Sequence, residues 1–145
     1  MNVLVDTSIW SVALRRRTSD LAPWQQAATR ELASLIADGR AALMAPVRQE
    51  LLSGISDQGR FAVLAERLRG FPDLPLGVDD WEAAARISNA CRRRGVTGSL
   101  VDFALCAAAM ERGLELFTAD DDFGRYASVV PIALFGGRVW GPGLE

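Results

Sequence analysis

The sequence predicts an α/β protein with a mostly parallel sheet of four or five strands and helices on both faces. Short apolar runs, typical of buried parallel strands, alternate with longer stretches that carry apolar residues at helical spacing. This alternation favours parallel pairing, because a helix is the usual connection between parallel strands. Half of the 145 residues are hydrophobic and 23% are charged, as in ordinary globular proteins. We therefore expect a single domain over residues 1–145.

The first half of the chain alternates two apolar runs with amphipathic stretches. We expect strands over residues 2–5 and 41–45. We expect helices over residues 9–17, 23–38 and 47–55, and a fourth around residues 61–68. Thr7 and Ser8 are suitable N-caps for the first helix, and Pro23 fits the first turn of the second.

The second half of the chain continues the alternation. Residues 71–76 contain two prolines, which exclude a helix and favour a short or edge strand. Asp79 and Asp80 are suitable caps for the next helix. We expect helices over residues 81–94 and 100–112, and strands over residues 114–117 and 129–132.

The residue types that are missing exclude many functions. The chain has no histidine and no lysine, so all 16 basic residues are arginine. This excludes Ser-His-Asp and Cys-His catalysis, histidine-bound zinc, P-loops and Schiff bases. Cys91 and Cys106 lack the spacing of metal ligands, and we expect them to be small buried hydrophobes. Carboxylates, hydroxyls and arginines remain, and carboxylates without histidine suit a hard cation such as Mg²⁺ or Mn²⁺.

No apolar run reaches the roughly 18 residues that a membrane span needs. The N-terminus has no basic residue before its apolar run, and Asp6 interrupts that run, so a signal peptide is not expected. We therefore expect a cytoplasmic protein.

Acidic residues follow two predicted strands and begin two predicted helices. Asp6 follows the first strand, the acidic run 120–122 follows the strand at 114–117, and Glu50 and Asp102 lie in early helical turns. In a parallel α/β sheet these positions share one edge, where such folds bind ligands. Each acid alone also fits an ordinary role as a turn, helix-capping or solvent-facing residue. Asp102, however, heads a nearly uncharged helix, where an acid does little for solubility.

These motifs together resemble the PIN-domain family and, within it, the VapC toxins of bacterial toxin–antitoxin pairs. The first motif is the segment 5–8, and the second is Glu50 in the segment 47–54. The third is Asp102 at the head of an alanine-rich helix. The fourth is the segment 118–123, which matches the family pattern T-x-D-x-D-F. The resemblance extends over essentially the whole chain in length, motif order and spacing.

The resemblance implies a three-layer PIN-like fold and an endoribonuclease that depends on Mg²⁺ or Mn²⁺. Its acidic quartet corresponds to Asp6, Glu50, Asp102 and Asp120. Metal ligands would come from Asp6, Asp102, Asp120 and a frequent fifth acid, Asp122. Hydroxyls that orient an acid or a water correspond to Thr7, Ser8 and Thr118.

The same resemblance implies macromolecular partners. They are an RNA substrate, such as transfer or ribosomal RNA, a small VapB-like antitoxin and a second copy in a homodimer. We expect Trp10, Trp24 and the first two helices to form the antitoxin groove, although Trp24 also fits plain core packing. Trp140, in the glycine-rich tail, would cover the sheet or join a dimer interface.

Two arginine clusters are candidates for RNA binding, because a guanidinium can bind phosphate through two hydrogen bonds. They are Arg15, Arg16 and Arg17, and Arg92, Arg93 and Arg94. Each cluster also fits an ordinary solvated helix end. Two other functions remain open: a catalytically silent PIN-like scaffold that binds RNA, and a structure-specific DNA nuclease.

Overall fold

A four-stranded parallel sheet in the order β2-β1-β3-β4 forms the centre of the computed structural model, which describes residues 2–15 and 18–144. The strands are β1 (Val3–Val5), β2 (Ala41–Ala42), β3 (Glu115–Phe117) and β4 (Ala133–Leu134). All three strand pairs are parallel. The predicted α/β class with a parallel sheet is therefore confirmed.

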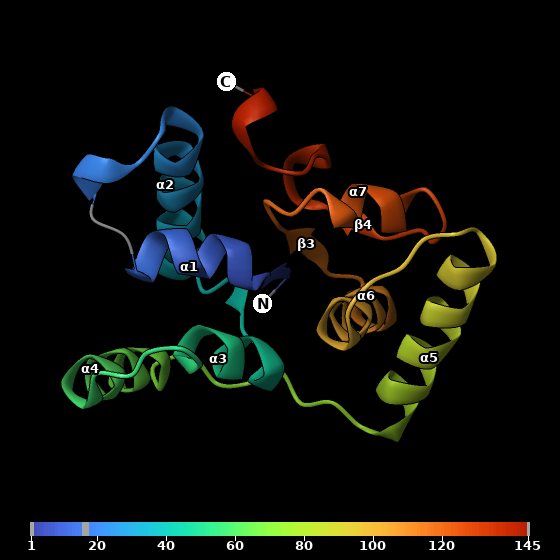
Figure 1. The fold of residues 1–145 in the computed structure, drawn as a ribbon, viewed down its shortest axis with the longest axis horizontal. Helices are drawn as coiled ribbons and strands as arrows, with labels where there is room; N and C mark the ends of the chain where they lie inside the picture. The colour runs from blue at the N-terminus through green and yellow to red at the C-terminus, as the bar shows by residue number, and fades with distance from the viewer. Residues whose placement is uncertain (1, 16–17, 145) are drawn as a thin grey trace.

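Helices α1 and α2 lie on one side of the sheet, and α5 and α6 lie on the other (Figure 1). The α-helices are α1 (Thr7–Arg15), α2 (Pro23–Ala37), α3 (Ala45–Leu52), α4 (Gln58–Leu68), α5 (Val78–Arg93), α6 (Leu100–Arg112) and α7 (Asp122–Ala127). The 3₁₀-helices are η1 (Thr18–Asp20), η2 (Phe135–Gly137) and η3 (Pro142–Leu144). No described helix has the length and apolar character needed to cross a membrane.

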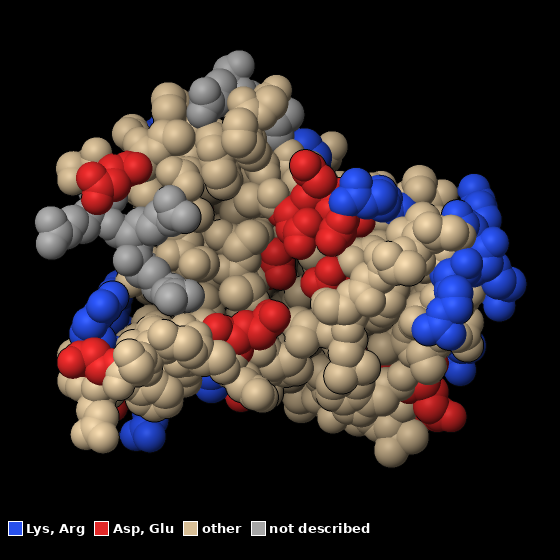
Figure 2. Space-filling model, viewed as in Figure 1, with Lys and Arg blue, Asp and Glu red and all other residues tan. Residues whose placement is uncertain are grey.

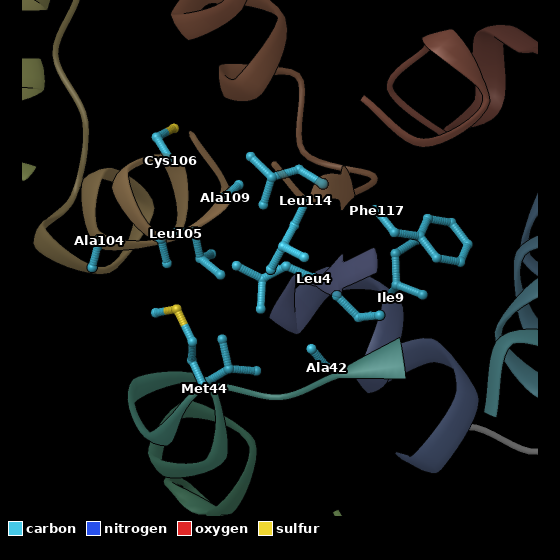
Figure 3. Packing of buried hydrophobic residues seen from close by; sticks show 14 of the residues in the cluster. Leu4, Ile9, Ala42, Met44, Ala104, Leu105, Cys106, Ala109, Leu114 and Phe117 are labelled. Carbon is cyan, nitrogen blue, oxygen red and sulfur yellow. The ribbon is translucent and has the colours of Figure 1, made fainter. Parts of the chain in front are cut away.

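The hydrophobic core lies between the sheet and its helices. Leu4 of β1, Met44 and Leu105 of α6 are fully buried, and Figure 3 shows them between β1, α3 and α6. The buried face of α6 is rich in alanine, whose small side chain lets this helix lie close to the sheet. Burying each large apolar side chain contributes about 1.5–3 kcal/mol. This packing holds the first turn of α6 beside the ends of β1 and β3.

Two predicted strands differ from the structure. Residues 71–76 form only an isolated bridge between Asp73 and Leu43, because the two prolines cannot donate hydrogen bonds to a ladder. The strand predicted over residues 129–132 was wrong in position, since β4 begins at Ala133. The amides of Val129 and Val130 donate instead to the carbonyl of Tyr126, which continues the turn after α7.

Two predicted helix caps were wrong. Thr7 and Ser8 lie inside α1, and the carbonyl of Asp6 accepts the amides of Ile9 and Trp10. The side chains of Thr7 and Ser8 are therefore available for other contacts. For α5, the N-cap is Gly77, and its amide donates to the carboxylate of Asp80 at 2.8 Å.

An ion pair ties α5 to α6. Arg112 donates to both carboxylate oxygens of Asp80, at 2.7 and 3.0 Å, and to the carbonyl of Pro75 at 2.7 Å. Both side chains are mostly buried. Hydrogen bonds from Arg112 lower the pKa of Asp80. The free thiols of Cys91 on α5 and Cys106 on α6 are both buried, as expected.

The prediction that Trp10 lines an antitoxin groove was wrong. Trp10 is fully buried, donates its indole N–H to the carbonyl of Val5 at 3.1 Å and packs edge-on against Phe71. Trp24 is half-buried on α2. Trp140 is buried and lies 5.2 Å from Phe117 between ring centroids, so it covers the end of β3.

Candidate active site

The register of the two central strands places Asp6 beside Thr118. Val5 of β1 pairs with Phe117 of β3, and Asp6 and Thr118 directly follow the two strands. The hydroxyl of Thr118 donates to Oδ2 of Asp6 at 2.9 Å. The amide of Asp6 also donates to the carbonyl of Phe117 at 2.9 Å. Residues 112 positions apart therefore meet at the carboxyl edge of the sheet, where α/β folds bind ligands.

A second hydroxyl also contacts the carboxylate of Asp6. Ser8 donates to Oδ2 of Asp6 at 2.7 Å, and the Ser8 oxygen accepts the amide of Ala119 at 2.9 Å. Asp6 is almost fully buried. Burial raises the pKa of Asp6, and the hydrogen bonds from Ser8 and Thr118 lower it in part. The two hydroxyls thus favour the ionised form of Asp6 and oppose part of the effect of burial.

The turn after β3 carries two more acids into the same region. The amide of Asp120 donates to the hydroxyl of Thr118 at 3.0 Å. The amide of Asp122 donates to Oδ1 of Asp120 at 2.9 Å, as in an Asx-turn. α7 then begins at Asp122, which explains why the acidic run is also a helix start.

The fourth aspartate comes from the first turn of α6. Ser99 is the N-cap of this helix and accepts the amide of Asp102 at 3.1 Å. The hydroxyl of Tyr126 donates to Oδ2 of Asp102 at 2.6 Å. Burial raises the pKa of Asp102 to about 6, and the negative charges of Asp6 and Asp120 contribute to the increase.

Three of these carboxylates converge. Asp102, Asp120 and Asp122 each place one oxygen within 4.8 Å of the others. They line a cleft of about 760 Å³, together with Glu50, Arg125 and the loop 95–99. Figure 2 shows acidic side chains gathered around a hollow near the centre of this face. Clustered carboxylates repel one another, and hard divalent cations prefer such oxygen ligands. The residues present therefore fit a divalent cation.

Asp6 and Glu50 are not members of this group of three. Asp6 is outside it, although its charge acts on Asp102. Glu50 is exposed on α3 at the rim of the cleft and accepts the hydroxyl of Thr7 at 2.7 Å. Thr7, Ser8 and Thr118 thus each donate to an acid of the predicted quartet.

The structure describes the side chains of only one of the two predicted arginine clusters. Arg16 and Arg17 lie outside the described residues, and Arg15 is described only by its backbone at the end of α1. Arg92, Arg93 and Arg94 are exposed at the end of α5, directly before the loop 95–99 that lines the cleft. Figure 2 shows basic side chains along the edge of the molecule at which α5 lies.

Three side chains of the site were absent from the predicted set. Arg125 forms an ion pair with Asp122 at the rim of the cleft. The spacing of three residues on one helix is a signal that predicts such a pair. Ser99 has the pattern of an N-cap three residues before Asp102. No sequence signal connects Tyr126 to Asp102, because that contact depends on how α7 returns to α6.

Comparisons with known proteins assign the family. A model of the PIN domain matches residues 3–129. "VapC ribonuclease Mb1587" of Mycobacterium bovis is 35% identical over 131 residues, which cover 88% of this chain and 92% of that protein. "Ribonuclease VapC11" of Mycobacterium tuberculosis gives the same values.

Solved structures agree in fold. FitAcB from Neisseria gonorrhoeae has a TM-score of 0.71 at 23% identity, with 91% of this chain and 95% of that chain covered. VapBC2 from Rickettsia felis, bound to a DNA fragment from their promoter, has a TM-score of 0.72 at 16% identity, with 92% of this chain and 97% of that chain covered. The strand order, the acidic edge and these matches lead to one conclusion: the chain belongs to the PIN-domain family and, within it, to the VapC group.

Proposed function

We propose that this chain is a divalent-metal-dependent endoribonuclease toxin that hydrolyses phosphodiester bonds in structured RNA of the cytoplasm. The convergence of Asp102, Asp120 and Asp122 within 4.8 Å, in an open cleft, is the observation that carries this proposal. The VapC relatives named as ribonucleases support it.

The three converging aspartates would hold Mg²⁺ or Mn²⁺, and the nearby Asp6 would add to the negative charge that acts on Asp102. When bound, such a cation acidifies water and neutralises charge on phosphate oxygens, which replaces the histidine that the chain lacks. The hydroxyls of Ser8 and Thr118 hold the Asp6 carboxylate in a fixed orientation. The preorganised carboxylates need little rearrangement when the substrate arrives.

Glu50 would orient the attacking water from the rim of the cleft. Thr7 fixes Oε1 of Glu50 through its 2.7 Å hydrogen bond, so the second oxygen has a defined direction. An ionised carboxylate accepts hydrogen bonds through both of its oxygens, so the second oxygen can hold a water molecule. This role differs from that of the three aspartates, which would contact the cation.

RNA must approach an acidic cleft, so positive charge is needed beside it. Arg92, Arg93 and Arg94 would supply it, because they precede the loop 95–99 at the rim. In the described parts of the chain, the ion pairs involve other arginines, namely Arg48, Arg69, Arg112 and Arg125. The guanidinium groups of the cluster therefore remain available for phosphate.

A VapB-like antitoxin would bind a groove beside α4, in place of the predicted groove around Trp10. This groove of about 480 Å³ is lined by Leu14, Ile55, Val63 and Leu64, with Arg60 and Arg67 at its border. Val63 is 63% exposed, so the apolar floor of this groove is open to solvent. An amphipathic segment with acidic residues would match both its apolar floor and its arginines.

A homodimer would use a second apolar surface, next to the acidic cleft. Val78, Trp81 and Leu100 are 75%, 42% and 77% exposed. Trp81 and Leu100 line a groove of about 530 Å³ that also includes Glu50. Exposed aromatic and aliphatic residues of this kind mark protein interfaces. Trp81→Glu should convert a dimer to a monomer in light scattering, and an unchanged dimer would exclude this surface.

The first experiment is cleavage of total RNA by the purified chain, free of antitoxin, with Mg²⁺, Mn²⁺ or EDTA. We expect discrete fragments that require a cation. Asp120→Asn should abolish cleavage, because it removes one carboxylate from the converging group. Asp121→Asn is the matched control: Asp121 is exposed, makes no side-chain cap and is outside the group, so its variant should cleave normally.

Other results would redirect the proposal. Folded protein that cleaves no RNA with either cation would favour the silent RNA-binding scaffold. Cleavage of flap-structured DNA, but not of RNA, would favour the DNA nuclease. An Asp120→Asn variant that cleaves at the wild-type rate would contradict the assigned site.

A further inference from the structure

Tyr126 contacts one acid of the cleft, Asp102, although it is not one of the acids or hydroxyls that define the family motifs. Its ring is fully buried and lies 5.2 Å, between centroids, from both Phe103 and Phe123. Its hydroxyl donates to Oδ2 of Asp102 at 2.6 Å. The ring is thus fixed by core packing, and its only polar atom is directed at a carboxylate of the candidate metal site.

Gly98 closes the other side of this hydroxyl. A Cβ atom added to Gly98 would lie 2.4 Å from the Tyr126 oxygen and 2.8 Å from Cζ of Phe103. Real Cβ atoms do not approach other atoms so closely, so the loop 95–99 can lie here only with glycine at position 98. The Tyr126 hydroxyl is therefore enclosed between the Gly98 backbone and Asp102.

We propose that Tyr126 is a positioning residue that fixes the rotation of the Asp102 carboxylate for cation binding. Asp102 stands in the first turn of α6, and its backbone is already fixed by the Ser99 cap. The side chain still has two free torsions, and a short hydrogen bond from a rigid tyrosine fixes them. Partners of this kind typically change metal affinity or activity by about 10–100-fold when they are removed. This inference rests on the proposed function of the acidic group.

The test is Mn²⁺ binding to the folded chain, measured by electron paramagnetic resonance without RNA. Tyr126→Phe keeps the ring and removes one oxygen, and we expect the Mn²⁺ dissociation constant to rise about 10-fold or more. Gly98→Ala should weaken Mn²⁺ binding as well, because its Cβ displaces the Tyr126 hydroxyl. Gly124→Ala is the matched control, since its Cβ would make an ordinary 3.8 Å contact with Val139.

Cleavage kinetics separate positioning from a purely structural role. In Tyr126→Phe, the Mn²⁺ concentration for half-maximal cleavage should rise by the same factor, and saturating Mn²⁺ should restore most of the wild-type rate. A variant with wild-type Mn²⁺ affinity would overturn the inference. So would a loss of rate that saturating Mn²⁺ does not restore.

The binding assay also distinguishes this inference from the proposed function. Wild-type protein that binds Mn²⁺ and cleaves no RNA would contradict the nuclease, while weaker binding by Tyr126→Phe would still support the role of Tyr126. Wild-type protein that binds no Mn²⁺ would overturn both.

Discussion

The hydroxyl of Thr118 lies 2.9 Å from Oδ2 of Asp6 and joins the ends of β3 and β1. The Thr118 hydroxyl oxygen also accepts the amide of Asp120 at 3.0 Å, so the buried side chain of Thr118 connects two acids of the site. Thr118 is fully buried, and water cannot replace it. The hydroxyl therefore supports both the stability of the strand ends and the geometry of the cleft.

Replacing Thr118 tests this connection. Thr118→Val keeps the shape of the side chain, removes one of the two hydroxyls that donate to Asp6 and leaves the Asp120 amide without its acceptor. We expect the free energy of unfolding to fall by about 1–3 kcal/mol in urea denaturation. Thr118→Ser keeps the hydroxyl and is the control, with a smaller decrease. Equal stability of Thr118→Val and the wild type would show that the hydrogen bonds contribute nothing.

The effect of Mn²⁺ on stability should depend on pH through Asp102. The folded-state pKa of Asp102 is about 6, above the unfolded value near 3.9. In the metal-free protein, the folded state therefore binds more protons between about pH 4 and 6, and Asp102 reduces stability as the pH rises through this range. A cation relieves that cost, since it binds the ionised form.

The corresponding measurement is the melting temperature with and without Mn²⁺ at pH 5 and pH 7.5. We expect Mn²⁺ to raise the melting temperature more at pH 7.5, where Asp102 is ionised, than at pH 5. Asp102→Asn is the control, because it removes the titrating group. Mn²⁺ should raise the melting temperature of this variant only slightly at both pH 5 and pH 7.5. An equal Mn²⁺ effect at the two pH values in the wild type would contradict the role of Asp102.

The ion pair between Asp80 and Arg112 should contribute to stability independently of the site. Asp80→Asn leaves the mostly buried Arg112 guanidinium without its charged partner, and we expect a decrease of about 2–4 kcal/mol in the free energy of unfolding at pH 7. The pKa of Asp80 is lowered by Arg112, so this contribution is present above about pH 4 and disappears as the pH falls through the folded-state pKa.

Chemical denaturation at pH 7 and pH 3 checks this prediction. The difference in the free energy of unfolding between the wild type and Asp80→Asn should be smaller at pH 3 than at pH 7. Asp79→Asn is the matched control, since Asp79 is exposed on the same helical turn. A constant difference at both pH values would mean that the pair acts through packing and not through charge.

The parts of the site that could be predicted from the sequence are those fixed by the sheet. Asp6 and Asp120 follow apolar runs, and parallel pairing brings the ends of such runs to one edge. Tyr126 could not be predicted, because its contact with Asp102 depends on the angle at which α7 packs against α6. The same limit applies to Trp10, since helical spacing does not distinguish a buried tryptophan from one in a surface groove.

The arginines at the end of α5 provide a last test, based on salt dependence. Binding of RNA to the inactive Asp120→Asn chain is measured over a range of salt concentrations. Changing Arg92, Arg93 and Arg94 to glutamine should weaken binding and flatten its dependence on the logarithm of salt concentration. The slope should fall by about 0.7 for each phosphate of single-stranded RNA that the protein no longer neutralises. The physical reason is that fewer counterions leave the RNA when fewer arginines bind its phosphates.

A triple change on and directly after α4 separates this local effect from net charge. Arg60, Arg67 and Arg69 are exposed, and changing them to glutamine removes the same charge from a part of the chain that does not line the acidic cleft. We expect this control to leave the salt slope close to that of the unchanged chain. Equal slopes for the two triple variants would mean that RNA responds to the overall charge of the protein, and the end of α5 would then have no specific part in binding. A flatter slope for the α5 variant alone would place the RNA backbone beside the loop 95–99, in reach of the converging aspartates.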